Sequence, residues 1–127
     1  MLYSLLIYEN AEEITADPEA LKRHAAEFGE FVAEVADKLR GGAPLKAPQD
    51  ATTIRVRNGE TITTDGPFAE TKEVLAGFFL VELDNLDDAL AAAAKIPVAK
   101  YGAVEVRPVA TEVMEAVNEE SGGQHPM

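Results

Sequence analysis

The chain is organised around the segment TDGPFAETKE, residues 64–73, which lies between two segments with strand-like patterns. Asp65-Gly66-Pro67 is a turn signal, because glycine takes positive φ angles freely and proline fixes its own φ and has no N–H group. Phe68 can anchor this loop on an apolar surface, so that the charged residues after it point in defined directions. Both a functional site and a well-ordered surface loop fit this pattern, because function concentrates in loops.

The segment before this loop gives the clearest local signal in the chain. Residues 52–57 and 60–64 are rich in β-branched side chains and flank Asn58-Gly59, a pair that favours a two-residue type I′ hairpin. The apolar residues of the hairpin are expected to face inward: Ile54, Val56 and Ile62. The hairpin is expected to hold the loop at Asp65 rigidly.

Three further strands are predicted from their apolar and β-branched patterns, over residues 2–8, 75–83 and 103–109. Between the first helix and the hairpin there is room for only a brief strand near Leu45. Gly77, inside the strand that follows the loop, indicates the close approach of another backbone, such as that of a partner subunit.

Two helices are predicted from their caps and apolar stripes. Asp17-Pro18 begins the first helix, which we expect to run to about Arg40 and to stop at Gly41-Gly42. Asp84-Asn85 caps the second helix, and Ile96-Pro97 ends it. The order β, α, β-hairpin, β, α, β places both helices on one face of an antiparallel sheet. The other face is left uncovered within one subunit, which predicts a homodimer.

Several of these segments resemble the DGPF group of the YCII-related proteins. The resemblance lies in DGPFAETKE at 65–73, in the strand GFFLVE at 77–82, and in three further stretches, residues 2–9, 53–59 and 104–108. It covers residues 1–110, which we take as one domain, and leaves residues 111–127 as a C-terminal tail that we expect to be partly disordered. It implies an α+β fold, a ferredoxin-like βαββαβ domain with an inserted β-hairpin that pairs into a dimeric α/β barrel. It implies little about chemistry, since fold does not fix function.

The composition excludes several classes of protein. The 127 residues carry 23 acidic and 11 basic side chains, a net charge of −12, whereas a nucleic-acid or anionic membrane surface needs clustered lysine and arginine. No cysteine is present, which excludes disulfides, a thiol nucleophile and cysteine-ligated metals. The N-terminus lacks the pattern of a signal peptide or membrane span, so we expect a cytoplasmic protein.

His24 is the only histidine inside the domain, and it lies beside the apolar stripe of the first helix. It can be a general base or proton shuttle, or a half-buried residue with one satisfied hydrogen bond. The resemblance implies a histidine in this helix that works with an aspartate just before a proline after the second helix. Ile96 stands at the aspartate's position here, so an acid from elsewhere, such as Asp65 or Glu105, would have to substitute.

Several other charged residues are also candidates for a role in a site or in fixing the loop. Glu105 and Arg107 share one face of the last strand, where they are cleft residues if that face lines the barrel and ordinary edge charges if it meets solvent. Arg55 and Arg57 can clamp a carboxylate or only solubilise the hairpin. Lys72, between acidic neighbours, is expected to form an ion pair that fixes the loop. No motif for a cofactor or a metal is present, so we expect none.

Two functions follow as hypotheses. The first is a cofactor-free acid–base enzyme or small-molecule binding protein, whose cleft lies between the first helix, the sheet face and the loop at residues 65–73. Its candidate catalytic residues are His24, Asp65, Glu70, Glu105 and Arg107. The second is a non-catalytic dimeric interaction module, because DGPF proteins resemble partners of extracytoplasmic-function sigma factors.

Overall fold

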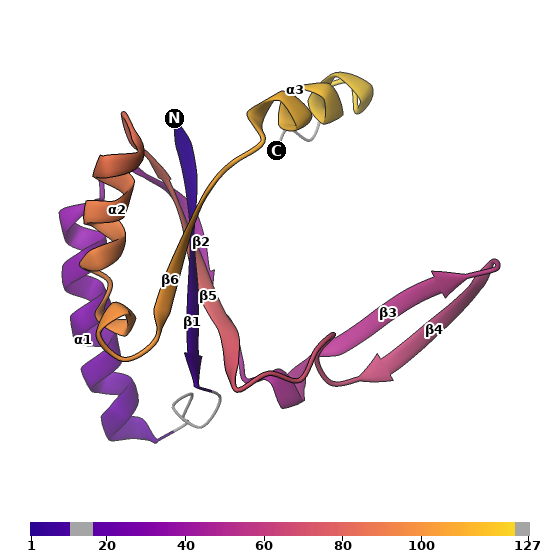
Figure 1. Ribbon diagram of the computed structural model, residues 1–127, viewed down its shortest axis with the longest axis horizontal. Coiled ribbons are helices and arrows are strands. Elements are labelled where there is room, and N and C mark those ends of the chain that lie inside the picture. Colours follow the sequence, from indigo (N-terminus) through magenta and orange to yellow (C-terminus); the bar gives the residue numbers. More distant parts are fainter. Residues whose placement is uncertain (11–16, 124–127) are drawn as a thin grey trace.

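The computed structural model describes residues 1–10 and 17–123, and it has a four-stranded antiparallel sheet with two helices on one face (Figure 1). Its elements are β1 Leu2–Asn10, α1 Pro18–Glu34, β2 Leu39–Pro44, β3 Thr52–Arg57, β4 Glu60–Asp65, β5 Glu73–Glu82, α2 Leu86–Ala94, β6 Ala103–Pro108 and α3 Thr111–Glu120. Two short 3₁₀ turns, Pro48–Asp50 and Pro97–Lys100, complete the described chain. The expected disorder at the end of the tail falls partly on residues 124–127, which lie outside the described residues.

The strands of the main sheet follow the order β2-β5-β1-β6, and every neighbouring pair is antiparallel. With the β3–β4 hairpin set aside, the chain order is βαββαβ, and the two central strands are the first and third of the four. This is the ferredoxin-like arrangement, so the predicted α+β fold class with an inserted hairpin is confirmed for the single chain.

The core forms where β1 and β5 meet the two helices. Alternate residues of β1 are buried on this face, among them Leu5, which is fully enclosed beside Val81 of β5 and Phe31 of α1. On α2 the buried residues are alanines, whose small side chains let the helix lie close to the sheet. The predicted cap of α2 is confirmed, since the Asn85 side chain accepts a hydrogen bond from the Asp88 N–H at 2.9 Å.

The predicted end of the first helix is wrong. The helix stops at Glu34, and residues 39–44 form β2 at the edge of the sheet, paired with β5. Gly41-Gly42 therefore lies inside a strand and does not follow a helix end. Local periodicity favours a longer helix. However, the edge of β5 offers these residues backbone pairing, with an irregularity between Leu39 and Gly41, and two consecutive glycines are unfavourable in a helix.

The hairpin turn is confirmed, whereas the predicted inward direction of the hairpin's apolar residues is wrong. Asn58 and Gly59 have the positive φ angles of 53° and 78° that the turn requires. However, β3 and β4 form a separate two-stranded sheet that projects from the core on the side away from the helices (Figure 1). Ile54 is 65% exposed, and Ile62 lies opposite Arg55 and so on the other face of the hairpin from Ile54 and Val56.

The face of the main sheet opposite the helices is not covered by any other element of the described chain. We call it the open face. It carries apolar residues of β1 and β5 together with the charged residues of β6: Leu6, Tyr8, Phe78, Leu80, Glu105 and Arg107. α3 follows β6 and extends away from the sheet on this same side (Figure 1). Among the described residues, no helix is long and apolar enough to cross a membrane.

Gly77 marks a close backbone approach, as the sequence predicts, but the neighbour belongs to the same chain. A Cβ atom at this position would lie 2.9 Å from the carbonyl oxygen of Ala43 and 3.2 Å from the Cα of Pro44, both in β2. The suggestion of a partner's backbone at this position is therefore wrong.

The substitution Gly77→Ala is expected to lower the free energy of unfolding by about 1–3 kcal/mol, because the new methyl group must push β2 away from β5. Gly29→Ala is the matched control. Gly29 lies inside α1 with open space around it, so alanine there is expected to raise the free energy of unfolding by about 0.5–1 kcal/mol. Urea unfolding measures both, and equal shifts would contradict the close packing of β2 on β5.

Candidate functional site

A cavity of about 460 Å³ lies on the helix side of the sheet, between α1, β1, β5 and the end of β2. Its walls are largely apolar. α1 contributes Leu21, Phe28 and Val32, and the sheet contributes Ile7 and Phe79. The Phe28 and Phe79 rings lie 6.4 Å apart and form one stacked wall. This volume is within the range of pockets that hold small molecules.

Two ionisable side chains enter this apolar cavity, Glu9 from β1 and His24 from α1. Glu9 continues the row of residues that β1 points at the helices, so the strand's alternation carries its carboxyl group into the interior, where the residue is 7% exposed. His24 lies three residues after Leu21 and four before Phe28, the spacing of one helical face. A carboxyl group and an imidazole in a mostly apolar cavity can bind the polar part of a ligand and transfer a proton.

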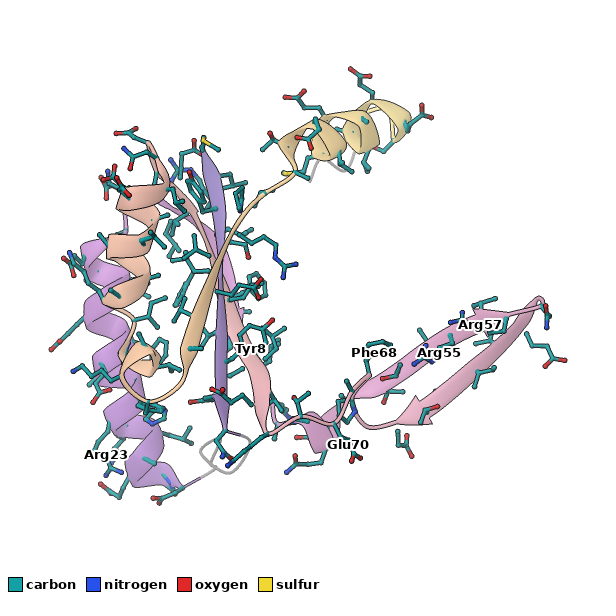
Figure 2. All side chains as sticks on the ribbon, viewed as in Figure 1. Tyr8, Arg23, Arg55, Arg57, Phe68 and Glu70 are labelled. Atoms are coloured by element: carbon teal, nitrogen blue, oxygen red, sulfur yellow. The ribbon has the colours of Figure 1, made fainter. Side chains whose placement is uncertain are left out.

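His24 also borders a second, more polar hollow, which is lined by Asn10, Arg23, Glu27 and Tyr101 as well. His24 therefore lies where the apolar cavity meets a polar surface. Figure 2 shows Arg23 on the outer part of α1 near the same end of the helix. A ligand that is apolar at one end and polar at the other fits these two neighbouring hollows.

The loop at residues 65–73 lies away from this cavity. Asp65 ends β4, Glu70 lies at the base of the hairpin (Figure 2), and both side chains are exposed. The loop is held by the hairpin, because the Gly66 N–H donates to the Ala51 carbonyl at 2.7 Å and the Thr53 hydroxyl donates to the Gly66 carbonyl at 2.9 Å. The expected cleft shared by His24 and this loop is therefore not formed within one chain.

The proposed anchoring role of Phe68 is also wrong for the single chain. Phe68 is 74% exposed, and the Arg55 guanidinium lies 4.9 Å from the centre of its ring in a cation–π contact. Within the described residues, Lys72 forms no ion pair, contrary to expectation. In that same part of the chain, no cluster of histidine and acidic residues has the arrangement of a metal site.

Glu105 and Arg107 lie together on the open face of β6 and pair with each other. The Arg107 guanidinium donates hydrogen bonds to the Glu105 carboxylate, one of them from Nε at 3.0 Å. This hydrogen bond and the charge of Glu105 raise the pKa of Arg107 above its ordinary value. The pair is on the opposite side of the sheet from His24, so the five predicted site residues do not form one cluster within a chain.

Sequence reasoning missed Glu9, which is the acid that the structure places in the same cavity as His24. The alternation of β1 carries the signal, since Tyr3, Leu5, Ile7 and Glu9 occupy every second position. Ile96, at the position where the family resemblance implies an aspartate, is fully buried in the core. The carboxyl group that shares the cavity with His24 comes instead from the first strand, β1.

Comparison with known proteins gives a relative of similar sequence and a solved structure of similar fold. An uncharacterized protein of Rhizobium meliloti (strain 1021) is 39% identical over 123 residues, which cover 87% of this chain and 93% of that protein. The structure of 5-chloro-2-hydroxyhydroquinone dehydrochlorinase (TftG) from Burkholderia phenoliruptrix AC1100, in complex with 2,5-dihydroxybenzoquinone, is similar with a TM-score of 0.50. It is 14% identical, and the match covers 86% of this chain and 93% of that one, so the likeness is one of fold. Residues 1–113 match the YCII-related domain, and the chain belongs to that family.

Proposed function

We propose that the protein binds a small ring-shaped molecule in the cavity beside α1 and carries out acid–base chemistry on it without a cofactor. The observation that supports this most directly is the pair formed by Glu9 and His24, the ionisable residues of a cavity that is otherwise largely apolar. A concave, mostly apolar pocket with a few polar groups is the usual form of a small-molecule site.

The chemistry of the walls indicates the kind of molecule. Phe28 and Phe79 offer flat apolar surfaces that suit an aromatic or quinone ring. Hydroxyl or carbonyl groups on that ring can then exchange hydrogen bonds with Glu9 and His24. A protein of similar fold was solved with 2,5-dihydroxybenzoquinone bound, which supports a ring of this size as a first probe.

The open face supports a second part of the proposal, that two copies pair through it. Leu6, Phe78 and Leu80 lie on this face without a covering layer from the described chain. A second copy that packs its own open face there would bury these side chains and enclose the Glu105–Arg107 pair, as in a dimeric α/β barrel.

Binding is tested by calorimetry with 2,5-dihydroxybenzoquinone, hydroquinone and phenol. Ala25→Phe places a large ring in the cavity from an exposed position on α1, and it is expected to weaken binding about tenfold or more. His24→Asn keeps a hydrogen-bonding group but cannot accept and release a proton near neutral pH. It is expected to keep most of the affinity and to lose proton transfer.

Glu70→Gln is the matched control for these variants, because Glu70 is exposed on the loop outside the cavity and its replacement is expected to leave binding unchanged. Affinities that are the same in wild type and Ala25→Phe would show that the ligand binds elsewhere, and this would overturn the proposed site.

Pairing of the open faces is tested by Leu6→Glu, which places a charge at the centre of that face. Analytical ultracentrifugation is expected to show a dimer for wild type and a monomer for this variant, because an unpaired charge would be buried on association. Leu86→Glu is the control, since Leu86 is similarly apolar but lies on the helix side and is exposed. A wild-type monomer would contradict the pairing.

A further inference from the structure

Two elements project from the core on the side of the open face, and neither is supported by the core. The first is the arm, which we define as residues 52–68, and the second is α3 (Figure 1). No residue of β3, β4 or α3 is buried. A two-stranded hairpin alone in water is marginally stable, and the same holds for a ten-residue helix. Both elements therefore need a surface to pack on.

One face of the arm combines apolar groups with two arginines and one glutamate, Glu60, which lies opposite Arg57 in the hairpin register. We call it the arm face and define it by Arg55, Arg57, Ile62 and Phe68. Arg55 lies opposite Ile62 in the hairpin register and above the Phe68 ring, and Figure 2 shows Arg55, Arg57 and Phe68 along the same stretch of the arm. Ile62 and Phe68 are exposed. Within residues 1–10 and 17–123, neither arginine forms a salt bridge.

α3 has the complementary character. Val113 and Val117, one turn apart, form an exposed apolar stripe. The helix contains no lysine or arginine. Four glutamates accompany the apolar stripe: Glu112, Glu115, Glu119 and Glu120. In a chain with a net charge of −12, such an acidic helix is repelled by most of its own surface. The two arginines of the arm face are the partners whose charge and apolar neighbours match α3.

The two elements leave the sheet at opposite ends, so they cannot meet within one chain. α3 follows Pro108, which pairs with Tyr3 at the start of β1, whereas the arm precedes Glu73, which pairs with Asn10 at the end of β1. A twofold axis perpendicular to the strands exchanges these two ends. In a dimer with that axis, the arm of each copy reaches the end of the sheet from which the partner's α3 projects.

We propose that the arm face of one copy docks on α3 of a second copy, twice in each dimer. This proposal rests on the proposed pairing of the open faces and specifies how the two copies are oriented. The alternative twofold axis, parallel to the strands, would bring arm to arm and arginine to arginine. Each arm then contacts α3 of the partner, and we call these two symmetric contacts the clasp. Val113 and Val117 pack on Ile62 and Phe68, and the glutamates pair with Arg55 and Arg57.

The chain has no cysteine, which allows a direct test by cross-linking. One preparation carries Ile62→Cys on the arm face and another carries Val113→Cys on α3. The two are mixed, allowed to exchange subunits and oxidised mildly. A disulfide between the two chains is expected in the mixture and not in either preparation alone, because each cysteine faces a position on the other copy that lacks one.

Ile54→Cys is the matched control, because Ile54 is at least as exposed as Ile62 but lies on the other face of the arm. Mixed with Val113→Cys, it is expected to give little cross-linked product. Cross-linking of Ile62→Cys with itself would show arm-to-arm contact and would overturn the proposal. A wild-type dimer that is dissociated by Leu6→Glu but gives no cross-link in the mixture would overturn the clasp alone, whereas a wild-type monomer would overturn both the clasp and the pairing.

Reversal of the charges on the arm face or on α3 gives an independent test of the proposed docking. Arg55→Glu with Arg57→Glu is expected to weaken dimerisation about tenfold, since attractive pairs at the rim become repulsive. Glu112→Lys with Glu115→Lys is expected to weaken it similarly, and mixing the two reversed chains is expected to restore affinity in part. Unchanged dimerisation in the arginine variant would contradict the role of the arm face and would favour a different protein as its partner.

Discussion

A single layer of sheet that is covered by helices on one face only is the constraint on which the rest of this structure depends. Residues alternate along β1, so every second side chain enters the core beneath α1 and α2, and the others form the open face. The same alternation carries Glu9 into the cavity with His24 and leaves Leu6 outside, where it needs cover. The proposed ligand site and the proposed dimer interface thus lie on opposite sides of one strand.

Much of the fold could be predicted from local signals. The Asn58-Gly59 turn, the Asn85 cap and the alternation in β6 each depend on neighbouring residues alone, and each is present in the structure. β2 was not predictable in this way. Leu39 fits the apolar period of a helix and also that of a strand, and the choice is made by pairing with β5, which is distant in sequence. The position of the hairpin could not be predicted from local signals either, since alternation defines the two faces of a hairpin but not what packs against them.

The site was predictable in part for the same reason. His24 stands out because it lies beside an apolar helical stripe, and the structure places it in the cavity. Asp65 and Glu70 stand out by the unusual composition of their loop, yet the loop is carried by the hairpin and does not line the cavity that contains His24. Glu9 lacks a motif and is recognised only when strand direction and burial are both known. Glu105 and Arg107 were correctly placed on one face of β6, whereas their mutual pairing depends on side-chain geometry that alternation does not specify.

The segment that carries the hairpin leaves the sheet after β2 and returns to it at β5, and a backbone hydrogen bond joins the two points. The Leu45 N–H donates to the Ala76 carbonyl at 2.8 Å, so the strands on either side are already joined before this segment begins. Residues 46–72 lie outside the four-stranded sheet, so their number and identity can change without altering the strand pairing of the core. Evolution can therefore lengthen, shorten or exchange this appendage while the cavity on the far side of the sheet keeps its lining.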